Sequence, residues 1–214
     1  MTDSNPLLAS HWRKQAVLNC LDAGDTIRLV CFLRERHTER FFEPIHRLTS
    51  ASGNEQGFGF AIMALCCLLV ETIQCYREGL PSSNETELER LRNYDNVPPK
   101  YQITEDDLKI KGKEIFRRFF TDYQSYFPCA NGIDFYNHIR NGLLHQAQTK
   151  GGWTINIERS KLWDVEQQSV DRDLFSYQLE NCFGKYLSDL SVKPFEQPEW
   201  SRAAKKVWWL CELS

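Results

Sequence analysis

The sequence predicts an all-α protein, an antiparallel bundle of helices with a short strand or hairpin insertion and C-terminal helices. Apolar residues recur at helical spacing along most of the chain. Residues 57–70, GFGFAIMALCCLLV, are apolar almost all round, as in a helix at the centre of a bundle. Strand-like alternation is confined to WTINIE at 153–158. A length of 214 residues with 42% hydrophobic content suits a single domain, residues 1–214, with a core at about 25–150 and an extension at 151–214.

Helix-breaking and capping residues divide the first half of the chain into several predicted helices. A first helix is expected at about 7–22, ending before Ala23-Gly24, and a second at about 25–48. The segment 49–57 has loop composition, and a third helix follows at about 58–78. Asn84 and Glu87 have the spacing of a capping box, which predicts a short helix after the break at Pro81.

The second half begins with a predicted helix start at Thr104 and Asp107. An aromatic stripe follows and ends at Pro128; such a stripe is more typical of a core than of a base-stacking platform. A helix is then expected at about 132–148, closed by Gly151-Gly152, with further helices at about 170–190 and 198–211. The stripe consists of Ile115, Phe116, Phe119, Phe120, Tyr123 and Phe127.

Composition excludes several classes of protein. A net charge of −3 gives no global basic field, so nucleic acid would have to be bound by a local patch. The eight cysteines form no C-x-x-C pair and no zinc spacing, which predicts free thiols in a reducing compartment. The N-terminus lacks the features of a signal peptide, and a 14-residue apolar run is too short to span a bilayer. We therefore expect a cytoplasmic protein without membrane attachment.

The helix at 132–148 carries an unusual polar face. At about 100° per residue, one side is apolar, and the other gathers amides, imidazoles and only one full charge. Arg140 falls off that polar stripe, at the rim of the apolar face, where its guanidinium must be paired or pointed into an interface. The polar stripe consists of Asp134, Asn137, His138, Asn141, His145 and Gln148.

Arg140, Asn141 and His145 supply what RNA cleavage without a metal requires. A base must remove the 2′-hydroxyl proton, a cation must hold the phosphate, and an acid must protonate the leaving 5′-oxygen. Arginine suits the phosphate because its fork matches two oxygens, and histidine titrates near neutral pH. One helix cannot supply both acid and base, whereas a second copy across a two-fold axis can.

The segment Arg140-Asn141-Gly142-Leu143-Leu144-His145 resembles the R-x4-H signature of HEPN ribonucleases, with the Asn that often follows the Arg. HEPN domains are helical bundles that carry this motif on a late helix, and the resemblance covers about residues 25–150. It implies a homodimer with two motifs in one cleft and cleavage that leaves a 2′,3′-cyclic phosphate. It also implies that His145 is the general acid or base, that Arg140 binds the phosphate, and that Asn141 orients the phosphate or the histidine.

Two further residues are auxiliary candidates. Glu71 closes the most apolar helix, so its carboxylate must be paired or protonated; it either holds Arg140 or His145 or pairs with an arginine of the second helix. His138 lies one heptad before His145 and is either part of the site or a solvated side chain. Two histidines without a carboxylate or thiolate make a poor metal site, so we expect neither metal nor cofactor.

Basic residues precede the motif helix and are candidates for contact with RNA, although a charged run is usually a solvated face. Arg117 and Arg118 fall outside the aromatic stripe and should be exposed. The full set is Lys109, Lys111, Lys113, Arg117 and Arg118.

The sequence thus favours a HEPN-type endoribonuclease, a toxin-like or antiphage effector acting on RNA, with a cognate antitoxin or inhibitor protein implied by the resemblance alone. The alternative is a non-catalytic HEPN-like module that binds a nucleotide or a partner protein. A third reading, a helical scaffold with a fortuitous motif, predicts a monomer with Arg140 in an internal salt bridge.

Overall fold

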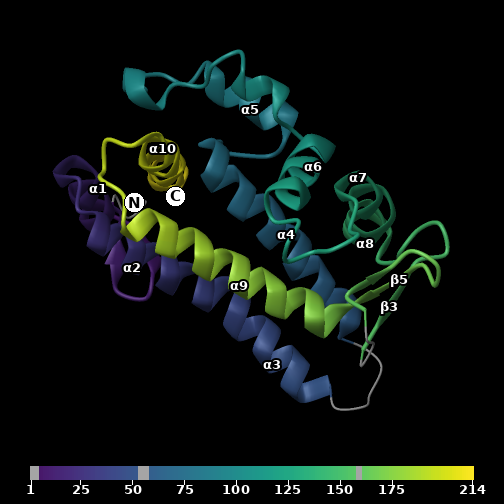
Figure 1. Ribbon diagram of the computed structural model, residues 1–214. Coiled ribbons are helices and arrows are strands. Elements are labelled where there is room, and N and C mark those ends of the chain that lie inside the picture. The colour runs from purple at the N-terminus through teal and green to yellow at the C-terminus, as the bar shows by residue number, and fades with distance from the viewer. Residues whose placement is uncertain (1–4, 53–57, 158–160) are drawn as a thin grey trace. The chain divides into compact units, whose positions relative to one another are not determined.

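The computed structural model describes residues 5–52, 58–157 and 161–214, and the protein is mostly helical with two small sheets (Figure 1). The prediction of a helical protein with strand insertions is therefore confirmed. The chain divides into two compact units. Unit 1 comprises Met1–Arg40, Cys75–Lys111 and Lys185–Ser214, and unit 2 comprises Phe41–Gln74 and Gly112–Gly184.

Unit 1 begins with a hairpin where the sequence predicted a helix. Strand β1 (Leu7–Ala9) pairs antiparallel with β2 (Trp12–Arg13), and only then does α1 (Lys14–Ala23) begin. The prediction of helix from residue 7 was wrong because side chains from beyond α1 bind this backbone: the guanidinium groups of Arg36 and Arg40 both donate to the Leu8 carbonyl. Gly24, at φ 63°, ends α1 at the expected place.

The second predicted helix is present but is not regular. Helix α2 (Thr26–His37) runs through a π-helical turn, Thr38–Phe42, into α3 (Glu43–Ser52). Asp25 caps α2 by accepting a hydrogen bond from the Arg28 backbone N–H at 3.0 Å. The helix extends beyond residue 48 into the segment expected to be a loop, and residues 53–57 of that segment lie outside the described residues.

Helix α4 (Gly59–Glu78) is the apolar helix, and half of its residues before Glu71 are buried. By length and composition it is also the one helix of the described residues that could cross a membrane, and 56% of its most apolar window is buried inside the protein. A core helix of this kind passes the same test. Gly79, at φ 74°, follows its last turn.

Two capping predictions have different outcomes. Helix α5 (Glu85–Arg92) begins as expected, since the Asn84 side chain accepts from the Glu87 backbone N–H at 3.0 Å. The Thr104–Asp107 pair also forms, with a Thr104 Oγ1 to Asp107 Oδ2 distance of 2.9 Å, but it opens only a 3₁₀ turn, Asp107–Lys109. The prediction that a long helix starts at these two residues was therefore wrong.

The C-terminal part of unit 1 is anchored by two tryptophans. Helix α10 (Pro198–Glu212) buries Trp200 and Trp209 completely. The Trp200 indole donates to the Leu190 carbonyl and the Trp209 indole to the Tyr101 carbonyl, each at 2.9 Å. These bonds satisfy the ring N–H groups that burial removes from water. A second 3₁₀ turn, Pro99–Tyr101, presents that carbonyl.

Unit 2 has an aromatic core, as the stripe predicted. Helix α6 (Lys113–Asp122) buries Phe116, Phe119 and Phe120, and Phe127 follows in the turn after it. Phe120 and Phe127 pack against Phe175, with ring centroids 6.2 and 5.0 Å apart. The helix ends at Asp122 rather than at Pro128, although the stripe beyond it is buried as expected.

The strand predicted from WTINIE exists, but its pairing differs from a hairpin. Strand β3 (Thr154–Asn156) pairs in parallel with β5 (Ser169–Asp171), and β4 (Trp163–Asp164) pairs antiparallel with β5 on its other side. The predicted strand insertion is thus a three-stranded sheet rather than a hairpin, because β5, buried throughout, is its central strand. Helix α9 (Arg172–Ser191) follows β5 directly.

Candidate functional site

The motif lies on a helix with a change of register in its middle. Helix α7 (Gly132–Asp134) passes through a π-helical turn, Phe135–Arg140, into α8 (Asn141–Gln146). Asn131 caps its start by accepting from the backbone N–H groups of Ile133 and Asp134. π-Helical turns are rare and often occur at functional sites. The regular α-helix assumed from the sequence was therefore wrong at the residues before the motif.

The register change alters which side chains meet. Arg140, expected off the polar stripe, contacts two of its members: Nη1 donates to Asn141 Oδ1 at 3.2 Å and lies 3.4 Å from His145 Nε2. The three residues of the R-x4-H motif that carry the proposed chemistry thus form one cluster. Because a guanidinium can only donate, the contact with His145 requires an unprotonated Nε2, which leaves the ring proton on Nδ1.

Glu71 lies against this cluster. Its Oε1 accepts from Arg140 Nε at 2.8 Å, and both side chains are largely buried, at 12% and 20% exposure. Of the three partners considered for Glu71, which were Arg140, His145 and an arginine of the second helix, the structure shows Arg140. An ion pair with a direct hydrogen bond fixes the plane of the guanidinium, because Nε is part of its rigid fork.

Tyr136 is a part of the site that the sequence reading missed. Its ring lies under the guanidinium, with Arg140 Cζ 5.4 Å from the ring centroid, close enough for a cation–π contact. The same ring packs on Phe116, with ring centroids 5.4 Å apart. The signal was the spacing of four residues to Arg140, which places two side chains on one helical face.

The chain turns sharply after the motif. Helix α8 ends at Gln146, and Ala147 takes the left-handed conformation at φ 52°, so Gly151-Gly152 is not the stop that we predicted. A Cβ on Gly142 would lie 2.2 Å from the Gln148 carbonyl oxygen, so the motif needs glycine there. This turn leaves His145 exposed to solvent.

The guanidinium has donor capacity to spare. Among residues 5–52, 58–157 and 161–214, no hydrogen bond to Arg140 Nη2 or to Asn141 Nδ2 is found. Near an exposed imidazole, such N–H groups can bind an anion. Cys67, on whose thiol the charges of Glu71 and Arg140 act, is no nucleophile here, because burial raises the pKa of its thiol.

His138 lies apart from the cluster in its contacts. Its ring stacks on Trp153 at 6.2 Å, and its Nδ1 is buried without a hydrogen-bond partner among the described residues. The backbone N–H of Lys150 donates to the His138 carbonyl at 2.8 Å. Within the described part of the chain, no group of three or more histidine, cysteine or acidic side chains is placed to hold a metal ion.

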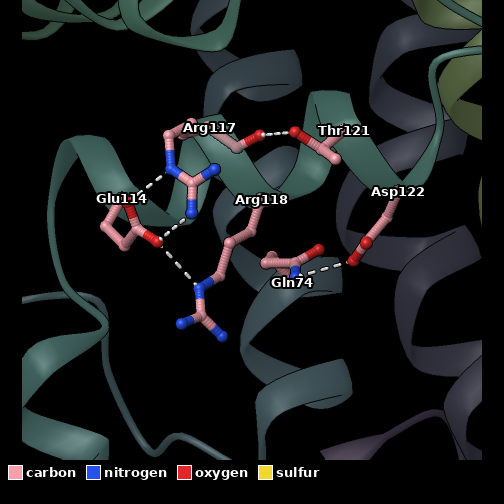
Figure 2. A network of polar contacts seen from close by, with 6 residues as sticks. All are labelled: Gln74, Glu114, Arg117, Arg118, Thr121 and Asp122. Carbon is pink, nitrogen blue, oxygen red and sulfur yellow. Dashed lines mark hydrogen bonds and ion pairs between the residues drawn. The ribbon is translucent and has the colours of Figure 1, made fainter.

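The basic residues before the motif are engaged with an acid (Figure 2). Glu114 accepts from Arg117 Nε at 2.7 Å and from Arg118 Nε at 2.9 Å. These bonds, the one from Arg117 first, lower the pKa of Glu114 to about 2. Arg117 is exposed and Arg118 half-buried, so only the former matches the predicted exposure, while Lys113 is exposed at the helix start. The Glu114 carboxylate partly neutralises the charge of the two arginines, which makes them weaker candidates for binding RNA.

The same close-up shows a second pair on these helices: Gln74 Nε2 donates to Asp122 Oδ2 at 3.1 Å (Figure 2). It ties α4 to the end of α6 within unit 2 and presents no free charge to a ligand.

No protein-family model, no curated protein and no solved structure matches this chain.

Proposed function

We propose that this chain is a metal-independent endoribonuclease of the HEPN type that acts as a homodimer. The observation that carries the proposal is the cluster around Arg140: Asn141 Oδ1 at 3.2 Å, His145 Nε2 at 3.4 Å and Glu71 Oε1 at 2.8 Å. It combines a fixed cation, an amide and a solvent-accessible imidazole, which are the groups that the reaction needs.

The reaction follows from these groups. Neutral His145 removes the proton of a 2′-hydroxyl, and the 2′-oxygen attacks the adjacent phosphorus. The bond from phosphorus to the 5′-oxygen breaks, and that oxygen takes a proton from the protonated His145 of the partner subunit. Arg140 Nη2 and Asn141 Nδ2 hold the non-bridging oxygens as charge develops on them. The products are a 2′,3′-cyclic phosphate and a 5′-hydroxyl.

A biological role as a cytoplasmic, toxin-like or antiphage effector restrained by an inhibitor protein rests on the resemblance alone. The second candidate is a non-catalytic module that binds a nucleotide or a partner protein through the same cluster. The Arg140–Glu71 ion pair is instead what the third hypothesis, a helical scaffold with a fortuitous motif, expects. The exposed His145 favours the enzyme, since a purely structural pair needs no imidazole beside it.

The test is cleavage of single-stranded RNA by the purified protein in excess EDTA. We expect cleavage to persist in chelator and to leave cyclic phosphate ends. His145→Ala should lower the rate by roughly 10²-fold or more, as loss of general acid–base catalysis predicts. Arg140→Ala should lower it comparably, because the phosphate then loses its cation.

Matched controls are available on the same chain. His46 is an exposed histidine on α3, and Arg47 beside it is an exposed arginine in an ion pair with Glu43, so His46→Ala and Arg47→Ala should cleave as the unchanged protein does. Equal rates for His145→Ala and His46→Ala would contradict the proposed role of His145. No cleavage by any form on several RNAs would favour the binding module.

A further inference from the structure

Unit 1 contains a pocket of about 250 Å³ that is separate from the residues of the motif. Three of its lining residues are cations from different segments: Arg77 in the last turn of α4, Lys193 after α9, and Arg202 early in α10. Two carboxylates, Asp189 and Glu199, also line it. Tyr186, which is buried, and Leu190 complete the wall.

Close backbone packing creates this concentration of charge. Gly79 has φ 74°, and a Cβ built on it would lie 3.1 Å from the Arg202 Cα and 3.2 Å from the Arg202 carbonyl oxygen. Helix α10 therefore meets the end of α4 without an intervening side chain. This contact brings the two arginines, Arg77 and Arg202, to one pocket.

The carboxylates of the pocket are already engaged. Glu199 Oε1 accepts from Lys193 Nζ at 2.5 Å, and that bond is the main cause of a lowered pKa at Glu199. Asp189 accepts from Lys185, one turn earlier on α9. Three cationic and two anionic side chains line the pocket, so its lining has a net positive charge.

Of the three cations that line the pocket, Arg202 is the one whose position is least explained by a contribution to the stability of the fold. It lies one turn into α10, near the positive end of the helix dipole, where a cation is unfavourable. Across the described segments, no hydrogen bond and no ion pair to its side chain is found, whereas Arg77 lies at a helix C-terminus, where a cation is favoured. An exposed guanidinium placed against the dipole and beside two cations suits a site that receives an anion.

We propose that this pocket binds a small phosphate monoester that also carries hydroxyl groups, such as a sugar phosphate. A phosphate monoester carries close to two negative charges at neutral pH and three oxygens that accept hydrogen bonds, which matches two guanidinium forks. The carboxylate oxygens of Asp189 and Glu199 have further lone pairs, and these accept hydrogen bonds from ligand hydroxyls. The small volume suits one such group rather than a nucleic acid strand.

The test is calorimetric titration of the full chain with ribose 5-phosphate, inorganic phosphate and ribose. We expect the two phosphates to bind, ribose 5-phosphate the more tightly, and ribose not to bind. Arg202→Gln should weaken ribose 5-phosphate binding about tenfold, the loss of one charge-assisted contact. Arg77→Gln/Arg202→Gln should abolish it.

Two controls separate the pocket from general charge and from misfolding. Arg34→Gln/Arg47→Gln removes two exposed arginines outside the pocket and should leave binding unchanged. Arg202 is exposed, so Arg202→Gln should retain the melting temperature of the unchanged protein. Absence of binding by either phosphate, equal binding of ribose, or full binding by Arg202→Gln would each overturn the proposal. No RNA is present, so failure here leaves the proposed ribonuclease untouched.

Discussion

At the scale of single residues, the nitrogen atoms of the Arg140 guanidinium contact different neighbours. Nε is held by Glu71, Nη1 faces Asn141 and His145, and the ring of Tyr136 lies beneath the plane. A guanidinium held on one edge keeps its other edge in a fixed direction, which lowers the cost of ordering it when an anion binds.

Glu71→Gln should therefore reduce RNA cleavage without abolishing it. The amide keeps the shape and one acceptor but loses the charge that holds Arg140, and a small misplacement of a phosphate-binding group costs roughly tenfold or more in kcat/KM. Steady-state kinetics on a short RNA measure this, with Glu43→Gln, the exposed partner of Arg47, as the control. A Glu71→Gln variant that folds and cleaves at the full rate would show that the ion pair has no role in positioning.

His37 gives a second prediction at this scale, for stability in acid. It is buried, its Nδ1–H donates to the Leu33 carbonyl at 2.7 Å, and burial is the main cause of a pKa lowered to about 3. The folded state thus binds fewer protons than the unfolded state between pH 6.5 and 3. The stability from neutral His37 is complete above pH 6.5 and is lost as the pH falls towards 3, by up to about 1.4 kcal/mol per pH unit.

Urea unfolding of the unchanged protein and of His37→Phe between pH 7 and 5.5 measures this effect. Few carboxylates titrate in that window, so the unchanged protein should lose stability with falling pH more steeply than the variant. The variant keeps a ring against Tyr76, whose centroid lies 5.3 Å from that of His37. His46→Ala, at an exposed histidine, should retain the steep slope; identical slopes for all three proteins would contradict the assignment.

At the scale of elements, two glycines in helices of unit 2 should respond oppositely to alanine. A Cβ on Gly132 would lie 2.4 Å from the Phe116 carbonyl oxygen, because α7 starts against the backbone of α6. Gly132→Ala should destabilise the protein by roughly 1–3 kcal/mol through overpacking. Gly184, inside α9, has nothing within 4 Å of such an atom, so Gly184→Ala should stabilise by about 0.5–1 kcal/mol. Thermal or urea unfolding compares the two variants, and a stable Gly132→Ala would mean that α6 and α7 separate easily.

Sequence patterns predicted the elements that are set by residues close together in the chain. The periodicity of the aromatic stripe placed α6 in a core, and the spacing of Asn84 and Glu87 placed the start of α5. The strand β1 was missed because its carbonyl is bound by Arg36 and Arg40, far along the chain, and β3 was mispaired because its partner is the later strand β5. Such long-range contacts leave no periodic trace in a sequence.

The candidate site, too, could be predicted from the sequence only in part. The spacing of Arg140, Asn141 and His145 was readable, and a lone carboxylate in an apolar helix signalled that Glu71 needed a partner. The angular position of Arg140 was not readable, because the π-helical turn at Phe135–Arg140 shifts the register. A wheel at 100° per residue separates Arg140 from side chains that it contacts. Tyr136, by contrast, was readable from its spacing of four residues to Arg140, which places both side chains on one helical face.

At the scale of the whole molecule, the proposed chemistry needs more than one chain. The cluster at Arg140 holds one imidazole, and the reaction needs a proton acceptor and a proton donor together. A net charge of −3 also means that two motifs side by side would concentrate cations that one copy lacks.

The last prediction is therefore that activity requires a dimer. Light scattering after size exclusion should give about 50 kDa, twice the 25.1 kDa of the chain. Activity per chain should fall on dilution as the dimer dissociates by mass action. Mixing His145→Ala with unchanged protein should lower the activity with the square of the share of unchanged chains, because a mixed dimer holds only one of the two imidazoles; a loss less steep than the share of inactive chains would show that a single imidazole suffices. The mechanism with one acid and one base requires the quadratic loss. A monomer that cleaves RNA at undiminished rate per chain upon dilution would refute it, and the general acid would then have to be sought within the same chain.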